Sequence, residues 1–158
     1  MPIRLTVNEK VHELDVDPRW LLADVLRHKL GCYGVHLGCE HGSCGSCTVL
    51  LEGRTALACC TLAVQADGFR ITTIEGLASH GELHSVQRAF HIEHGLQCGF
   101  CTPGFVLAAC DLLKRIPNPD DETVRSELSG NLCRCTGYTN IVKAVRTASR
   151  LIKEETER

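Results

Sequence analysis

The sequence predicts an α+β protein built from two small domains, and three observations carry this prediction. Within the first 76 residues several short segments alternate apolar and polar side chains with the period of β-strands and one has the period of a helix, whereas the rest of the chain shows only the period of helices. A segment rich in glycine, serine and histidine, residues 76–84, separates the two patterns. We therefore expect a mixed α+β unit at residues 1–76 and a helical unit at residues 77–158.

The first unit begins with a predicted hairpin. Residues 3–7 and 11–16 alternate with period two, which favours two strands that share one buried face. Their connection carries Asn8-Glu9 where Asn-Gly is the stronger signal, so we expect a longer or less tight turn. Apolar residues then recur at helical spacing from Leu21 to Leu30, and Gly31 suits the end of a short amphipathic helix.

Three more strands complete this unit. Residues 48–51 and 54–57 flank Glu52-Gly53 and predict a second hairpin, and residues 69–74 predict a further strand.

The second unit is predicted to contain four helices and no strand. The first helix includes Leu83 to Phe90 and ends at Gly95. The next has Thr102 as its N-cap and is apolar on nearly every side until Pro117, so it should be the buried centre of a four-helix arrangement. A polar helix at 120–129 and a helix with one apolar stripe at 141–152 follow.

Composition excludes several classes of protein. The 158 residues carry a formal net charge of -2, and no apolar run approaches the length that would span a bilayer. With Lys+Arg 17, Asp+Glu 19 and few aromatic residues, no nucleic-acid surface is indicated. The N-terminal residues do not resemble a secretory signal, so we expect a reducing cytoplasmic location.

The chain has eleven cysteines, an odd number that excludes complete internal disulfide pairing and favours metal binding. Cys39, Cys44, Cys47 and Cys59 have the spacing C-x4-C-x2-C-x11-C, whose first part is the plant-type [2Fe-2S] signature. The intervening glycines, among them Gly42, let the backbone approach a cluster and point N–H groups at its sulfurs. A structural zinc site is the alternative, but zinc ligands are usually paired in two short knuckles.

A second set of cysteines lies in the helical half. Cys98, Cys101, Cys133 and Cys135 form a C-x2-C and a C-x-C pair, which suit zinc or a [2Fe-2S] cluster equally well by count. The helix that follows Cys101 directs its positive end at this site, which favours an anionic group there.

Three motifs together resemble the iron-sulfur subunit of the xanthine oxidase family of molybdenum hydroxylases. They are GCEHGSCGSCTV at residues 38–49, QCGFCTPG at residues 97–104 and GNLCRCTGY at residues 130–138. The resemblance extends over almost the whole chain. It implies two [2Fe-2S] clusters, an N-terminal ferredoxin-like β-grasp domain and a C-terminal four-helix bundle domain.

The resemblance also implies roles for particular residues. Gln97 matches a glutamine that contacts the molybdenum-pterin cofactor, and Cys135 matches the cluster ligand closest to that cofactor. Cys59, rather than the adjacent Cys60, preserves the family's spacing. Cys32, Cys60 and Cys110 are then surplus, and we expect each to be a small buried packing residue.

The family's partners follow from the same resemblance. They are a large molybdenum-pterin subunit and a medium FAD subunit, in a heterotrimer that could itself dimerise. The sequence has no catalytic triad, phosphate-binding loop or Rossmann fingerprint, so bond making and flavin binding belong to other chains. The chain itself is predicted to be an electron-transfer subunit; a free two-cluster ferredoxin and a zinc-stapled interaction module are the alternatives.

Overall fold

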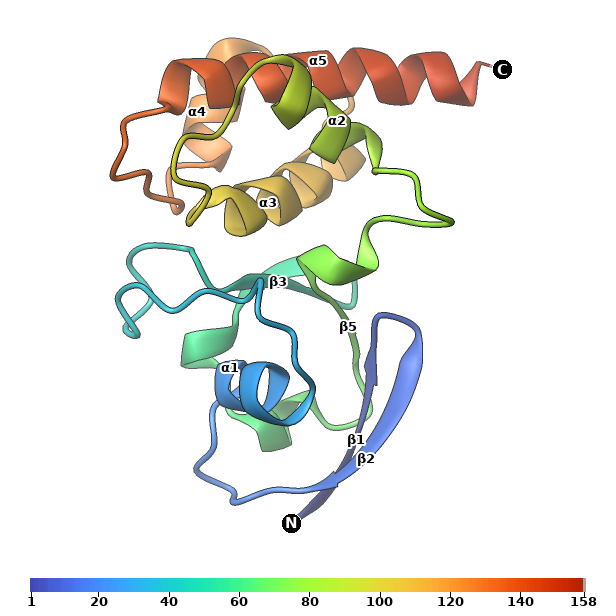
Figure 1. The fold of residues 1–158 in the computed structure, drawn as a ribbon, viewed down its shortest axis with the longest axis vertical. Helices are drawn as coiled ribbons and strands as arrows, with labels where there is room; N and C mark the ends of the chain where they lie inside the picture. Colours follow the sequence, from blue (N-terminus) through green and yellow to red (C-terminus); the bar gives the residue numbers. More distant parts are fainter. Residues whose placement is uncertain (158) are drawn as a thin grey trace.

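A computed structural model describes residues 1–157. It has a five-stranded sheet in the first half of the chain and four α-helices in the second. In Figure 1 these helices lie above the sheet. The predicted α+β class is confirmed, and each half encloses its own cluster of buried apolar side chains.

The sheet has the strand order β2-β1-β5-β3-β4. β1 and β5 are parallel, and the other neighbours are antiparallel. The strands are β1 (Pro2–Val7), β2 (Lys10–Asp15), β3 (Thr48–Leu51), β4 (Arg54–Leu57) and β5 (Arg70–Thr72). All five correspond to predicted strands, although β5 is shorter than residues 69–74.

The turn between β1 and β2 is tight, so the expectation of a longer or looser turn was wrong. Val7 pairs with Lys10, which leaves only Asn8 and Glu9 in the loop, both at positive φ (49° and 65°). The Asn8 side chain stabilises this conformation: its Oδ1 accepts a hydrogen bond from Thr73 N at 2.9 Å, and its Nδ2 donates to Thr73 Oγ1 at 2.9 Å. The hydrogen bonds to Thr73 thus hold Asn8 at a positive φ that glycine would adopt without cost.

One face of the sheet is covered by the predicted helix over residues 21–30. It begins as α1 (Leu22–Asp24) and continues as a π-helical segment (Val25–Lys29). Its buried Leu22 and Leu26 belong to the same apolar core as Leu5 of β1 and Ile71 of β5. Short 3₁₀ turns at Ala58–Cys60, Ala63–Ala66 and Ile74–Gly76 complete this half.

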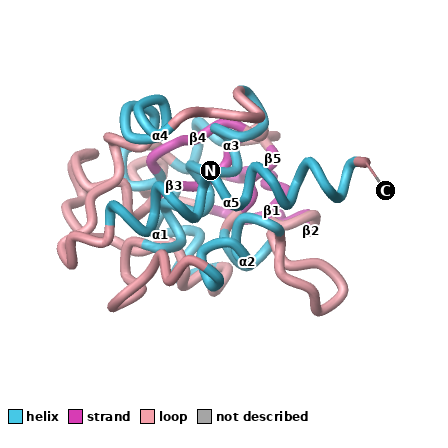
Figure 2. The backbone as a smooth tube through the Cα atoms, turned by 90° about the horizontal axis from the view of Figure 1, so that it is seen from above, coloured by secondary structure: helices cyan, strands magenta, loops and turns pink. Residues whose placement is uncertain are grey.

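The second half contains the four expected helices, which share one apolar core. Figure 2 gives the view of the backbone from above. The helices are α2 (Ser85–Ile92), α3 (Thr102–Arg115), α4 (Asp121–Glu127) and α5 (Tyr138–Thr156). Asp120 caps α4 by accepting from Thr123 N at 2.8 Å. The prediction that Thr102 caps α3 was wrong, because Cys101 occupies the N-cap and Thr102 is the first helical residue.

The two halves are joined at α3, which packs on β3 and β4 (Figure 1). Asp111 of α3, whose side chain is 2% exposed, forms ion pairs with Arg54 at 3.1 Å and Arg115 at 3.3 Å. It also accepts a hydrogen bond from Thr55 Oγ1 at 3.2 Å. The sheet and the helices are therefore connected by a buried carboxylate as well as by apolar packing.

Candidate iron-sulfur sites

The first set of cysteines comes together where the loop before β3 meets the turn after β4. Cys47 directly precedes β3 and Cys59 follows β4. The β3–β4 pairing continues to Ala58 N, which donates to Cys47 O at 3.3 Å. Cys39 and Cys44 lie on the preceding loop. Cys47 and Cys59 are buried, whereas Cys39 and Cys44 are partly exposed, so one side of the site faces the protein interior.

Backbone N–H groups of this loop point at sulfur atoms. Ser43 N and Cys44 N donate to Cys39 Sγ at 3.3 and 3.4 Å, and Ser46 N donates to Cys44 Sγ at 3.5 Å. Gly42 and Gly45 have φ values of +87° and +72°, in the left-handed region that suits glycine. The loop therefore presents backbone N–H donors to the sulfur atoms of Cys39 and Cys44.

The pKa values of these thiols differ according to burial. N–H groups, first that of His41, lower the pKa of Cys39 to about 6. Burial raises the pKa of Cys47 to about 12. A buried thiol of this kind becomes a thiolate readily only when a metal replaces its proton, since a metal ligand must be deprotonated.

Cys60 does not fit its predicted role. We expected a buried packing residue, but Cys60 is exposed, and its Sγ lies 3.6 Å from Cys59 Sγ. Its side chain extends to the edge of the first site rather than into the core. Of the other two surplus cysteines, Cys32 is buried as predicted and Cys110 is partly buried.

The second set of cysteines lies on two loops, one before α3 and one before α5. Cys133 is buried and Cys98 is exposed, so this site also runs from the interior to the surface. Gly137 N donates to Cys133 Sγ at 3.4 Å, and Cys133 N donates to the Tyr138 hydroxyl at 2.8 Å. Gln97 Nε2 donates to Cys135 O at 3.1 Å. Gln97 thus lies beside the cysteine that the resemblance associates with it.

Local groups also affect the thiols of the second site. Burial raises the pKa of Cys101 to about 12, whereas backbone N–H groups, first that of Phe100, lower the pKa of Cys98. The hydroxyl of Thr102, adjacent to Cys101, is buried without a hydrogen-bond partner. Four thiols on two loops, with Gly137 N donating to Cys133 Sγ at 3.4 Å, form a donor set that fits an iron-sulfur group.

Within residues 1–157, no three Cys, His, Asp or Glu side chains converge on a single ion position. Each set supplies four thiols, which is the number that a [2Fe-2S] cluster takes, two on each of its two irons.

The two sites are adjacent across the junction of the halves. Leu132 N donates to Cys44 O at 2.9 Å, which joins the loop of one site to the loop of the other. A cavity of about 620 Å³ is lined by cysteines of both sets and by Phe100, Leu132 and Tyr138. Sequence spacing treated the two sets separately and did not predict this contact.

Two further residues that sequence reasoning missed hold the loops together. Asn131 Nδ2 donates to Gly45 O at 3.0 Å. The His36 ring stacks on Phe100 with 4.6 Å between centroids, and its Nδ1 lies 2.6 Å from Phe100 O. Asn131 lies within one of the quoted motifs, but a sequence motif does not say which distant backbone group a side chain meets.

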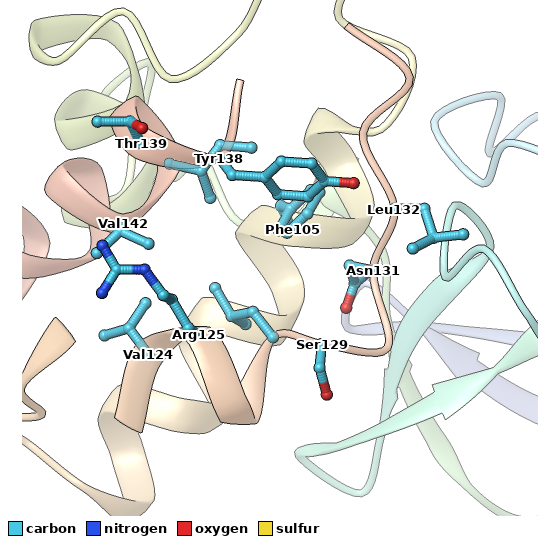
Figure 3. Close-up of a pocket in the computed structure, with 11 residues that line it drawn as sticks. Phe105, Val124, Arg125, Ser129, Asn131, Leu132, Tyr138, Thr139 and Val142 are labelled. Atoms are coloured by element: carbon cyan, nitrogen blue, oxygen red, sulfur yellow. The ribbon is translucent and has the colours of Figure 1, made fainter. Parts of the chain in front are cut away.

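A separate pocket of about 330 Å³ lies between α3, α4 and α5 (Figure 3). The ring of Tyr138 extends across it towards Leu132, and Phe105 lies behind. Its lining is mainly apolar, and Arg125 is its one charged side chain. Its other polar side chains are those of Ser129, Asn131, Tyr138 and Thr139, and no cysteine of either set lines it.

No helix in the described part of the chain is long and apolar enough to cross a membrane.

Two family models match the chain. One describes a 2Fe-2S iron-sulfur cluster binding domain and matches residues 5–64, and the other describes a [2Fe-2S] binding domain and matches residues 73–146.

Curated relatives are similar over nearly their full length. The chain is 51% identical over 152 residues to caffeine dehydrogenase subunit gamma of Pseudomonas sp. (strain CBB1), covering 93% of this chain and 90% of the relative. It is 51% identical over 146 residues to the nicotine 6-hydroxylase small subunit of Paenarthrobacter nicotinovorans, covering 92% and 88%.

Solved structures have the same fold. Quinoline 2-oxidoreductase from Pseudomonas putida 86 matches with a TM-score of 0.93 and 44% identity, over 98% of this chain and 96% of that one. Aldehyde oxidoreductase from Desulfovibrio gigas matches with a TM-score of 0.92 and 44% identity, over 98% of this chain but 17% of that one. In the second case the match is to a segment of a much longer polypeptide.

Proposed function

Since the chain belongs to the iron-sulfur small subunits of the xanthine oxidase family of molybdenum hydroxylases, we propose that it conducts electrons within such a complex. It is a subunit of an oxidoreductase whose substrate chemistry takes place on a partner subunit. In our proposal electrons pass singly from a molybdenum-pterin cofactor on a large subunit, through two [2Fe-2S] clusters in this chain, to FAD on a medium subunit.

The ligands in this proposal are the two sets of cysteines. A domain at residues 1–76, ferredoxin-like with a β-grasp fold, would hold the first cluster through Cys39, Cys44, Cys47 and Cys59. A four-helix bundle domain at residues 77–158 would hold the second through Cys98, Cys101, Cys133 and Cys135. A bound [2Fe-2S] cluster takes up and releases one electron at a time.

The observation that carries the proposal is the direct connection between the two sites. The hydrogen bond from Leu132 N to Cys44 O, at 2.9 Å, leaves one hydrogen bond and a short stretch of backbone between a cysteine of each set. Asn131 holds the same two loops in register through Gly45 O. Two metal sites whose loops are hydrogen-bonded to each other suit electron transfer between them. Two sites that only stabilised the fold independently would not need to be adjacent.

Exposed apolar side chains beside the cysteines support an interface with a partner, which we propose is the molybdenum-pterin subunit. Phe100, Leu132 and Tyr138 are 45%, 50% and 42% exposed, although all three are large and line the cavity beside the cysteines. Clustered exposed apolar side chains mark an interface. Gln97 Nε2 donates to Cys135 O, and in our proposal the remainder of the Gln97 amide contacts the cofactor.

The eleven free cysteines also agree with a reducing compartment, and we propose a cytoplasmic heterotrimer.

The test is purification of the chain with its partners, followed by iron analysis and EPR. We expect recovery in a complex containing molybdenum and FAD, about four irons per chain and two distinct [2Fe-2S] signals. Recovery of an active lone chain would instead indicate a free two-cluster ferredoxin. A colourless protein with zinc and no iron would indicate the interaction module.

The role of Gln97 has its own prediction. Gln97→Ala should leave both EPR signals intact but slow reduction by an oxidisable substrate, because the contact to the cofactor is lost. The substrate is first found by screening caffeine, nicotine, quinoline and an aldehyde. Gln65→Ala is the matched control, because Gln65 bonds the Leu62 amide in the other half. Dithionite should reduce all forms equally, and an unchanged substrate rate in Gln97→Ala would reject the assigned contact.

A further inference from the structure

The first site has a fifth thiol at its edge. Cys60 and Cys59 lie on the same 3₁₀ turn, Ala58–Cys60, and their Sγ atoms are 3.6 Å apart. Cys59 is buried and Cys60 is exposed, so one thiol lies on the interior side of the turn and the other on its solvent side. Of the remaining two surplus cysteines, Cys110 lies near His84, 3.9 Å from its Nδ1, and Cys32 is buried in the core of the sheet half.

Cys60 also touches the opposite wall of the site. A Cβ atom built on Gly42 would lie 3.1 Å from Cys60 Sγ, so the absent side chain leaves room for this sulfur. Gly42 belongs to the loop between Cys39 and Cys44, whose N–H groups point at sulfur. Cys60 Sγ therefore lies between the turn that supplies Cys59 and the loop that supplies two other candidate ligands.

We propose that Cys60 is a reserve ligand of the first cluster, able to replace Cys59 as its fourth thiolate. This inference rests on the proposed assignment of the first site. In the exchange Cys60 Sγ loses its proton to solvent and forms a bond to iron, while Cys59 Sγ breaks its bond to iron and takes up a proton. One thiolate replaces another, so neither the charge nor the oxidation state of the cluster changes.

Cys59 is the ligand of this set whose Sγ contacts Cys60 Sγ, at 3.6 Å. Cys60 is exposed, so its side chain can rotate without displacing packed neighbours. Cys47 is also buried, and the thiols beside it, those of Cys59 and Cys44, are themselves candidate ligands. Loss of Cys47 should therefore empty the first site, while loss of Cys59 should not.

The experiment compares alanine variants of the full chain in its complex, using iron content and EPR. Cys59→Ala should keep about four irons and both [2Fe-2S] signals, with a shift in the first signal only, whereas Cys59→Ala/Cys60→Ala should keep about two irons. Cys47→Ala should also keep about two irons, and the second cluster's signal in each sample reports that the chain is folded.

Each other outcome has one meaning. Retention of four irons in Cys47→Ala would overturn the proposed first site itself. Loss of the first signal in both Cys47→Ala and Cys59→Ala would leave that site standing and overturn the role of Cys60. Retention in the double variant would also overturn it, because another group would then be the replacement.

Cys59→Ser, which is closer in size to the native residue, is the second variant if the Cys59→Ala chain does not fold, as reported by loss of the second cluster's signal. Its first EPR signal should change when Cys60→Ala is added. Identical signals with and without Cys60 would refute the exchange.

Discussion

Removal of the Asp111 carboxylate should weaken the junction between the two halves. The side chain is 2% exposed and receives Arg54 Nε at 3.1 Å, Arg115 Nε at 3.3 Å and two donors from Thr55, Oγ1 at 3.2 Å and N at 3.4 Å. Since this junction also positions the first cysteine loop against the second, its strength bears on both sites.

The magnitude follows from what Asp111→Ala leaves behind. The loss of one partner from a fully buried ion pair costs about 3–5 kcal/mol. Here the arginine side chains are 68% and 32% exposed, so water can solvate them, and most of that penalty is avoided. Thr55 is exposed as well, so each of its two hydrogen bonds to Asp111 counts only for the ordinary net value of about 0.5–1.5 kcal/mol. We expect a loss of about 2 kcal/mol, which corresponds to a fall of about 1 M in the urea midpoint.

The assay is urea unfolding of the anaerobically purified full chain with two probes. Trp20, the single tryptophan, packs on the core of the sheet half, whereas far-UV circular dichroism reports mainly the helical half. In the native sequence the two transitions should coincide, and in Asp111→Ala they should separate. Asp121→Ala, which removes an exposed pair with Arg146 at 3.0 Å, is the control and should cost less than about 1 kcal/mol. Equal midpoint shifts for the two variants would refute the reasoning.

Two other predictions concern the first loop and the pH dependence of stability. Gly45→Ala places a Cβ 2.5 Å from both Asn131 Nδ2 and Gly130 O at a φ of +72°, so it should lower stability and first-cluster occupancy. Gly68→Ala is the control, because Gly68 has a φ of +80° but a Cβ there would have nothing within 4 Å, so only backbone strain is added. If both variants lowered the iron content equally, the steric argument for Gly45 would be contradicted. Burial lowers the pKa of His84, so the unfolded chain binds this proton more readily and stability should fall as the pH drops below about 6.5. His84→Ser keeps a capping oxygen for Val86 N without a titrating ring, and its urea midpoint should change less between pH 7 and 5; equal slopes would exclude His84 as the cause.

The sequence predicted features that depend on neighbouring residues. The strands and helices follow from periodicity, because a side chain's face is set by its distance along the same element. The cysteine sets follow from spacing, because Cys39 to Cys47 lie on one short loop and Cys133 and Cys135 on another. The local sequence pattern was less reliable for the exact start of α3, where Cys101 and not Thr102 occupies the N-cap position.

Only the tertiary structure decided what depends on residues far apart in the chain. The tight turn at Asn8 rests on Thr73, and the position of Gly45 rests on Asn131, a contact across 86 residues. The exposure of Cys60 depends on how the turn after β4 packs against the loop that contains Gly42, and the spacing of cysteines in the sequence does not predict that packing. The sequence by itself therefore determined two sets of thiols. Their adjacency, and the fifth thiol beside the first set, were decided by the packing of α3 on the sheet, because that packing brings distant loops within hydrogen-bond distance.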